Sequence, residues 1–309
     1  MRDLGGESEA GEDGADDAGI LERGVRGHRD SVYTGRVDST VEAMVRAARS
    51  GAEVALAHYR RGVPAALKPD GSPVTVADRE AEQAIVEALG AVFPDHGFLG
   101  EEMGAAGPSG ARFIIDPIDG TRNFIRRIPW WATLIALEEG GEITAGVVYQ
   151  PVTGDLHAAR RGRGAFLNGE RLRVSDIETL DRALLVHPSL TLLRGDGLWD
   201  AFVRLVDATP RQRGFGDFLC YTTVAEGRAE IGLGVNVKAW DLAALKLLVE
   251  EAGGRFTDFD GVPTIDSRQA VATNGRLHDA VLALLGSSGT LPPRGGPGGG
   301  ESSVRGRGH

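Results

Sequence analysis

The chain has 309 residues, a mass of 32.6 kDa, a formal net charge of −10 and a sequence pI of about 5.3. Because such an acidic chain without a basic stripe repels phosphate backbones and anionic lipid surfaces, we exclude a nucleic acid polymer and a membrane surface as partners. No apolar run approaches the ~18 residues of a membrane span, and the single cysteine, Cys220, cannot form an internal disulfide, so we expect a reduced, cytoplasmic protein.

Both ends of the chain are predicted to lie outside the fold. Residues 1–37 are expected to form a disordered acidic arm, since the stretch from Asp3 to Asp17 has seven acidic residues, no basic one and little to bury. Residues 287–309 form a Gly/Pro/Ser-rich stretch that cannot sustain a packed element, and we expect a disordered tail.

Two helices are predicted first in the ordered part. Ser39 and Glu42 have the spacing of a capping box, and apolar residues then recur at helical spacing. A second helix is expected from Val76 to Val92, because Thr75 and Asp78 suit its first turn and an apolar stripe follows them.

Strands and helices then follow in blocks. Residues 113–174 predict a meander of antiparallel strands, because short apolar runs are separated by Gly-rich turns. The later part mixes strands near 183–187 and 229–233 with helices near 217–226, 241–252 and 278–285. This order indicates layered α/β (α+β) packing of one domain over 38–286, with an N-terminal half of about 38–178 and a C-terminal half of about 179–286.

The segment IIDPIDGTRNF, residues 114–124, places two aspartates around a tight turn directly after an apolar strand. Pro117 fixes φ and removes a donor, so the carboxylates of Asp116 and Asp119 can converge with the carbonyl of Ile118. Such an all-oxygen cluster suits Mg²⁺, which keeps positions open for phosphate oxygens and an attacking water. An isolated D-P-x-D-G is equally compatible with a turn that an aspartate caps, so other segments must decide.

Three further features support a metal and phosphate site. The amides of Gly120 and Thr121, at the start of a short helical turn, are suited to bind an anion. Upstream, FLGEE ends an apolar run in two adjacent carboxylates; alternation lets only one of them face the same way as Asp116, and we select Glu101. Downstream, Asp241 follows a tryptophan at the start of a helix, as an N-cap or as a fourth carboxylate.

The segments GEE, DPIDGTRNF and WDLAALKLLVEEAGG, in this order, resemble the inositol monophosphatase family of Mg²⁺-dependent phosphomonoesterases. The resemblance covers roughly residues 41–285, including KPDGSPVTVADREAE, and implies a layered αβαβα sandwich of the inositol monophosphatase / sugar phosphatase type. It also implies two or three Mg²⁺ ions per active site, a small-molecule phosphate ester as substrate and a homodimer. The metal ligands that it implies are Glu101, Asp116, the Ile118 carbonyl, Asp119 and Asp241.

The resemblance also implies how phosphate and water are handled. The backbone amides of Gly120 and Thr121 would hold the phosphate. Water would be oriented and deprotonated by the side chains of Thr121, Thr75, Asp78 and Glu101. Lys68 resembles a basic residue near the family's site, although a lysine in a loop can equally be a solvated surface residue.

The choice of phosphate ester depends on other positions. DGTRNF, with Arg122, and the segment RGFGDFLCYTTVAEG resemble the histidinol-phosphate phosphatases of this family, so L-histidinol phosphate, a histidine-biosynthesis substrate, is the expected ester. Residues Arg213 to Asp217 would then line the substrate pocket, where Asp217 would pair with a cationic amine or imidazole, or else cap the next helix. Seven residues before Asp241, the family commonly has a glutamate that contacts substrate, whereas this chain has Gly234.

Other functions stay open at this point. Inositol 1-phosphate, an adenosine bisphosphate and a secondary-metabolite phosphate are alternative substrates. A non-enzyme alternative is a phosphate-ligand-binding regulatory protein that keeps the fold and has lost a metal ligand. All four carboxylates of the expected cluster are present, which favours an active hydrolase.

Overall fold

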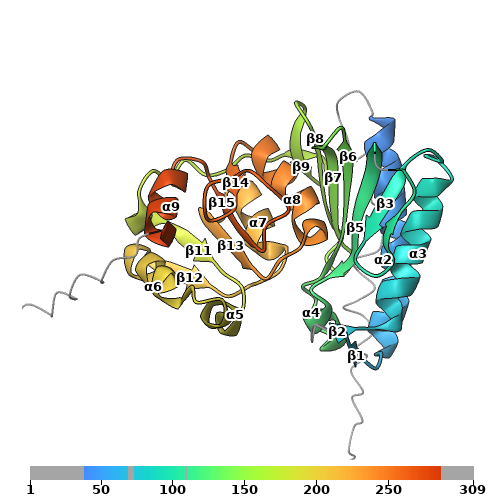
Figure 1. Ribbon diagram of the computed structural model, residues 1–309, viewed down its shortest axis with the longest axis horizontal. Coiled ribbons are helices and arrows are strands. Elements are labelled where there is room, and N and C mark those ends of the chain that lie inside the picture. The colour runs from blue at the N-terminus through green and yellow to red at the C-terminus, as the bar shows by residue number, and fades with distance from the viewer. Residues whose placement is uncertain (1–37, 69–72, 109, 287–309) are drawn as a thin grey trace, which may run out of the picture.

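The computed structural model describes residues 38–68, 73–108 and 110–286 (Figure 1). The predicted acidic arm, 1–37, and the predicted tail, 287–309, lie outside the described residues. The described chain forms alternating layers of helices, a large sheet, helices, a smaller sheet and helices, so the expected αβαβα sandwich is confirmed (Figure 1). Within these ranges, no helix combines the length and the apolarity needed to cross a bilayer.

The first outer helix, α2 (Ser39–Arg61), begins at the predicted cap residue Ser39, so its N-cap, Asp38, lies one residue earlier than predicted. The carboxylate of Asp38 accepts a hydrogen bond from the amide of Thr40 at 3.1 Å and a second from the following amide. The predicted capping box of Ser39 and Glu42 is therefore wrong, because Asp38 already accepts from the orphan amides of the first turn.

The second outer helix, α3 (Val76–Gly90), has the capping box that the sequence predicts, formed by Thr75 and Asp78. It ends two residues before Val92. Helices α2 and α3 pack against each other and against the outer face of the large sheet (Figure 1). Their shared core is formed by buried side chains from both helices and the sheet, including Met44, Ile85, Leu89, Phe113, Ile115 and Ile135.

The large sheet has eight strands in the order β10-β9-β8-β7-β6-β5-β3-β4. The predicted meander is confirmed, because neighbouring strands from β5 to β10 pair antiparallel, whereas β3 pairs parallel with β5. A separate two-stranded ribbon precedes α3. The strand bounds are β1 (Ala66–Leu67), β2 (Pro73–Val74), β3 (Gly97–Gly100), β4 (Gly104–Ala106), β5 (Ala111–Asp119), β6 (Ala132–Glu139), β7 (Glu142–Gln150), β8 (Asp155–Arg160), β9 (Gly164–Leu167) and β10 (Glu170–Arg171).

The smaller sheet has five strands in the order β12-β11-β13-β15-β14, with bounds β11 (Leu184–Val186), β12 (Arg211–Arg213), β13 (Ile231–Val235), β14 (Arg255–Thr257) and β15 (Gln269–Thr273). The remaining helices are α4 (Thr121–Ile125), α5 (Leu190–Gly195), α6 (Trp199–Ala208), α7 (Leu219–Ala225), α8 (Ala239–Glu251) and α9 (His278–Gly286), with a 3-10 turn at Leu180–Arg182. The elements α5, α6, β12, β14 and β15 are not among the sequence predictions, since most are too short to show a clear period.

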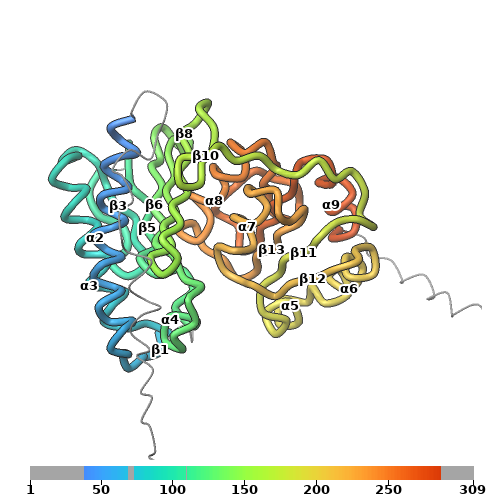
Figure 2. Tube along the Cα trace, turned by 180° about the vertical axis from the view of Figure 1, so that it is seen from behind, coloured from blue at the N-terminus to red at the C-terminus, as the bar shows by residue number. Residues whose placement is uncertain are grey.

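Helix α8 is the central element of the sandwich. It lies between the two sheets beside α7, and its residues from Leu242 to Val249 are all buried (Figures 1 and 2). A helix that is apolar on all sides is typical of such a middle layer. Gly146 of β7 allows the close approach, because a Cβ there would lie 3.0 Å from the carbonyl oxygen of Ala244. This packing aims the N-terminus of α8 at the end of β5.

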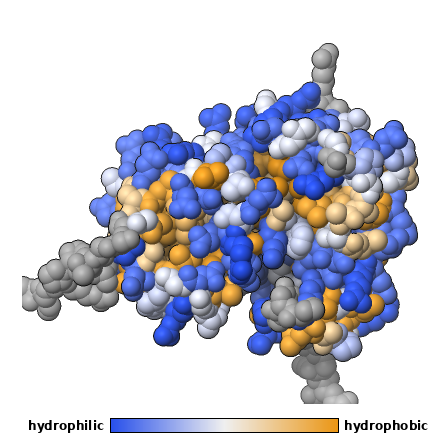
Figure 3. All heavy atoms as spheres, in the orientation of Figure 1, coloured by the Kyte–Doolittle hydropathy of each residue, from blue (hydrophilic) through white to orange (hydrophobic). Residues whose placement is uncertain are grey.

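The surface agrees with the composition. Hydrophilic residues cover much of the face seen in Figure 3, broken by smaller hydrophobic areas. Scattered apolar side chains are normal on a protein surface.

A buried histidine opens the last helix. Nε2 of His278 lies 3.0 Å from the hydroxyl of Thr257, and Nδ1 lies 3.0 Å from the hydroxyl of Thr273. Since Thr257 donates its only hydroxyl proton to the carbonyl of Asp258, Nε2 is the donor and Nδ1 accepts from Thr273. Burial and the positive charge of Arg255 lower the pKa of His278 from 6.5 to about 4.

We predict that this histidine makes stability fall with acidification. The unfolded chain protonates His278 through its ordinary pKa of 6.5, whereas the folded chain protonates it only near 4, so stability is lost as pH falls between these values. From pH 7 to pH 5, the group should lower the free energy of unfolding by about 2 kcal/mol. Urea denaturation of wild type and His278→Gln at both pH values checks this, and equal pH slopes in the two proteins would contradict it.

Candidate active site

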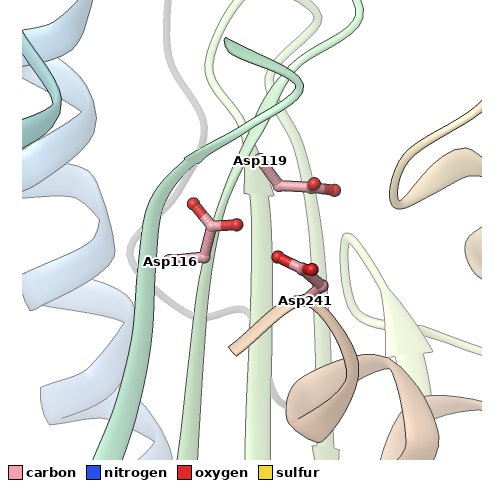
Figure 4. Close-up of side chains that lie close together, drawn as sticks. All are labelled: Asp116, Asp119 and Asp241. Atoms are coloured by element: carbon pink, nitrogen blue, oxygen red, sulfur yellow. The ribbon is translucent and has the colours of Figure 1, made fainter. Parts of the chain in front are cut away.

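Three acidic side chains from distant parts of the chain converge at the end of β5. Asp116 and Asp119 come from β5 and Asp241 from the first turn of α8, and one carboxylate oxygen from each lies within 4.8 Å of the others. Their carboxylates point toward a common space (Figure 4). Asp116 is 1% exposed and Asp119 is 8% exposed. The structure thus brings together three of the four carboxylates that the sequence selects.

Asp241 is not the N-cap of its helix. Lys238 holds that position, and its backbone N–H donates to Asp241 Oδ2 at 2.7 Å. The capping bond orients the carboxylate of Asp241 toward Asp116 and Asp119 (Figure 4). Of the two sequence interpretations, the structure therefore supports the carboxylate cluster.

The cluster carries uncompensated negative charge. Burial raises the pKa of Asp116 well above its usual range, and the charges of Glu101 and Asp119 raise it further. Burial also raises the pKa of Asp119 well above normal, with added repulsion from Asp217 and Asp241, and brings the pKa of Asp241 to about 7. Buried carboxylates at this distance need a positive partner, and an all-oxygen donor set fits a hard divalent cation such as Mg²⁺.

Glu101 lies at the edge of the cluster. It follows β3, lines the same cavity as the three aspartates, and accepts a hydrogen bond from Lys68 Nζ at 2.6 Å. The same ammonium lies 2.5 Å from Glu102 Oε1, and Glu102 does not line the cavity. Burial opposes the charge of Lys68, but hydrogen bonds and attraction from the two glutamates outweigh it, so its pKa is raised. Lys68 is thus a paired residue beside the site, and Glu101 is the glutamate that faces it.

The turn after β5 is held by its own hydrogen bonds. The amide of Ile118 donates to Asp116 Oδ1 at 2.9 Å. The hydroxyl of Thr121 lies 3.1 Å from the carbonyl oxygen of Ile118, which retains a second lone pair, and 3.3 Å from Asp78 Oδ1. Gly120 between them has φ 90°, in the left-handed region that favours glycine.

Asp78 links this turn to helix α3. Its Oδ2 accepts from both the amide and the hydroxyl of Thr75 at 2.7 Å, while Oδ1 faces Thr121. Burial raises the pKa of Asp78. Because the Thr75 hydroxyl donates its proton to Asp78, it orients this carboxylate, which in turn positions the Thr121 hydroxyl.

The architecture, the acidic cluster and the D-P-x-D-G turn together point to one family, and the sequence match agrees. The sequence model of a protein family, described as "Inositol monophosphatase family", matches residues 36–290 of the chain. The chain belongs to the inositol monophosphatase family. It is a phosphoric monoester hydrolase of a metal-dependent family, and the resemblance seen in its motifs is confirmed.

Relatives of this family member carry several names. Histidinol-phosphatase of Mycobacterium tuberculosis is 47% identical over 224 residues, which cover 71% of this chain and 86% of that protein. Inositol-1-monophosphatase of Mesorhizobium japonicum is 37% identical over 71% of this chain and 85% of that protein. The crystal structure of the extragenic suppressor protein suhB from Bartonella henselae has a TM-score of 0.77 and 34% identity, and covers 81% of this chain and all of that one. These names differ, so they do not fix one substrate.

The family's acidic cluster lies in a cavity of about 480 Å³. Four of the predicted substrate-binding residues line it, namely Gly120, Thr121, Arg122 and Asp217. Of the other two, Lys68 lies beside the cavity on Glu101, and Arg213, contrary to the prediction, does not line it. It lies on the edge strand β12, is exposed, and donates to the carbonyl of Gln212 at 2.8 Å, which holds it outside the cavity.

Asp217 faces the cavity and does not cap the following helix. The residue that caps α7 is Phe218, and its amide donates to Asp119 Oδ2 at 2.6 Å. Asp217 Oδ2 accepts a hydrogen bond from Asn123 Nδ2 at 3.1 Å. Desolvation raises the pKa of Asp217 to about 6, and the positive charge of Arg122 opposes this shift.

Some of the cavity wall is absent from the sequence predictions. Part of the wall comes from the start of α5 and from the end of β13 and the residues after it, namely Pro188, Ser189, Thr191 and Leu192, and Leu233, Val235, Asn236 and Val237 around Gly234. Tyr221 of α7 also lines the cavity. Asn123 does not line the cavity but donates to Asp217, and its place within the DGTRNF motif offered a signal for it, whereas Tyr221 lies in an apolar helical stretch that is typical of core.

Proposed function

We propose that this phosphatase uses Mg²⁺ to hydrolyse L-histidinol phosphate to L-histidinol and phosphate. The observation that carries the proposal is the placement of Asp217 in the same cavity as the acidic cluster, beside the phosphate-binding turn. A separate carboxylate there suits a substrate with a cationic amine or imidazole on the alcohol part. The 47% identity to a protein named histidinol-phosphatase supports the same choice.

The metal-binding residues in this proposal are Glu101, Asp116, the Ile118 carbonyl, Asp119 and Asp241, with two or three ions held between them. Bound Mg²⁺ supplies a water of lowered pKa and stabilises negative charge on the phosphate oxygens. The carboxylate and carbonyl oxygens of these five residues are the ligand types that Mg²⁺ prefers.

The protein's own groups position the phosphate and the attacking water. The amides of Gly120 and Thr121 donate to phosphate oxygens at the start of α4. The Thr121 hydroxyl donates toward Asp78 and its lone pairs face the water, so as it takes the proton of the water its own proton passes to the carboxylate of Asp78, which Thr75 keeps in place. Water attacks directly, without a covalent intermediate on the enzyme. Lys68 keeps the carboxylate of Glu101 oriented at the cavity edge.

We predict that the enzyme requires a metal ion for activity and prefers histidinol phosphate to inositol 1-phosphate. Phosphate release from histidinol phosphate and inositol 1-phosphate is measured in parallel with Mg²⁺, with EDTA, and after Mg²⁺ is restored. We expect EDTA to reduce both rates at least about a thousandfold and restored Mg²⁺ to recover them, because the cation supplies several kcal/mol of transition-state stabilisation. Preference for inositol 1-phosphate would overturn the substrate, and full activity in EDTA would overturn the metal.

Inositol 1-phosphate is the second candidate substrate. The 37% identity to a protein named inositol-1-monophosphatase favours it. Asp217 would then accept hydrogen bonds from ring hydroxyls in place of an amine. Magnesium-dependent but slow turnover of both esters would point to another small phosphate ester, an adenosine bisphosphate or a secondary-metabolite phosphate among them.

We further propose that the enzyme acts in the cytoplasm as a homodimer on a small phosphate ester, with no nucleic acid polymer or membrane as a partner. The acidic net charge of −10 supports the exclusion of nucleic acid polymers and membranes. Light scattering of the purified full-length chain tests the dimer, since a monomer would have a mass of 32.6 kDa.

A further inference from the structure

One polar group in the cavity wall lacks a partner. The Tyr221 side chain lines the cavity on α7, is 2% exposed, and its hydroxyl makes no hydrogen bond within the described part of the chain. Its ring packs against Phe256 at 5.5 Å between centroids, which keeps the ring in place. A buried hydroxyl without a partner is destabilising, so a group that enters the cavity is the natural partner for it.

Gly234 explains why the hydroxyl can lie where it does. A Cβ on Gly234 would lie 1.8 Å from Tyr221 Oη and 3.2 Å from a methyl carbon of Val237. No side chain at position 234 is therefore compatible with this position of Tyr221. The phenol occupies the space that a glutamate at 234 would need.

We propose that Tyr221 is a specificity-determining residue, whose hydroxyl binds a polar group on the alcohol part of the phosphate ester. It supplies the contact that Gly234 cannot make. Asp217 lies four residues earlier and lines the same cavity, so the two side chains address one end of the substrate, Asp217 by charge and Tyr221 by a hydrogen bond. The inference rests on the phosphomonoesterase function proposed above and adds a determinant of its substrate choice.

The chemistry of the phenol fits this role. Burial raises the pKa of Tyr221 well above 10, and the negative charges of Asp241, Asp119 and Asp217 raise it further, so the hydroxyl keeps its proton. A neutral phenol donates one hydrogen bond and accepts others. It therefore serves a substrate hydroxyl, an amine or an imidazole without placing another charge beside the acidic cluster.

The test compares esters with and without a polar group on the alcohol part. The specificity ratio is kcat/KM for histidinol phosphate divided by kcat/KM for phenyl phosphate, whose leaving group has no hydrogen-bonding substituent. If inositol 1-phosphate is hydrolysed faster than histidinol phosphate, it takes the numerator, since it also carries such groups. For Tyr221→Phe we expect this ratio to fall about ten- to a hundredfold, mainly through KM, with phenyl phosphate turnover changed less than about twofold.

A matched control is Tyr149→Phe, on β7 outside the cavity, which should leave the ratio unchanged. A specificity ratio that is unchanged in Tyr221→Phe, whether neither ester or both esters equally lose kcat/KM, would overturn the role of Tyr221. Absence of magnesium-dependent hydrolysis of both histidinol phosphate and inositol 1-phosphate by the wild type would instead overturn the proposed function. The two failures are therefore distinguishable.

A second experiment tests the contact without substrate. Gly234→Ala should lower the melting temperature of the wild type markedly, because its Cβ meets Tyr221 Oη at 1.8 Å. In the Tyr221→Phe background the drop should be smaller, since the hydroxyl is gone and the nearest ring carbon is 3.1 Å away. Equal drops in the two backgrounds would show that the phenol does not occupy this space in the folded protein.

Discussion

Asp119→Asn is expected to lower kcat at least about a thousandfold in the presence of Mg²⁺ while the protein stays folded. Asp119 is buried in the acidic cluster at the end of β5, directly before Gly120 and the start of α4. The amide keeps the size of the side chain and can still accept from the Phe218 N–H, which donates to Asp119 Oδ2 at 2.6 Å. Because the substitution removes only the charge of the side chain, the loss of kcat measures the contribution of the cation that this charge binds.

The measurement is phosphate release at saturating ester, paired with thermal denaturation without metal. Asp119→Asn should melt at a higher temperature than the wild type in EDTA, because one of the mutually repelling buried carboxylates is gone. The exposed Asp266→Asn should change neither quantity. Activity that survives in Asp119→Asn would contradict the assignment of the cluster as the metal site.

Gly120→Ala is expected to cost about 2 kcal/mol of stability and about a hundredfold in activity. Gly120 has φ 90°, and a Cβ would lie 3.0 Å from the carbonyl oxygen of Trp130 and 3.2 Å from Asp217 Oδ2. An alanine must therefore displace the turn that carries Thr121. The phosphate would lose aligned donors, and the transition state would lose more than the ground state.

Urea denaturation and steady-state kinetics check this second prediction together. Gly195→Ala is the matched control, because it lies at the end of helix α5 with open space around its Cβ position. It should be neutral or slightly stabilising. A Gly120→Ala enzyme with wild-type stability and activity would show that neither the left-handed backbone nor the close approach is required.

Most elements of the layered fold could be predicted from the sequence, because the patterns that indicate them are local. The Thr75 and Asp78 capping box, the strand meander of residues 113–174 and the turn that joins Asp116 to Asp119 each depend on residues a few positions apart. The αβαβα order itself came from the family resemblance of the motifs and is confirmed. The missed elements, such as α5 and β12, are short, and the error at Ser39 arose because a capping residue one position earlier competed for the same amides.

The sequence by itself determined which residue types form the acidic turn, since proline, glycine and two aspartates at that spacing restrict the backbone directly. The family resemblance implies that Asp241 is a ligand, but only the tertiary structure shows that it reaches this turn, that Lys68 pairs with Glu101, and that Arg213 does not line the cavity. It alone also placed the hydroxyl of Tyr221 in the space over Gly234. The contacts of Asp241 and Lys68 join segments far apart in the chain, and the packing of α8 between two sheets, rather than any local pattern, places Asp241 beside the turn after β5.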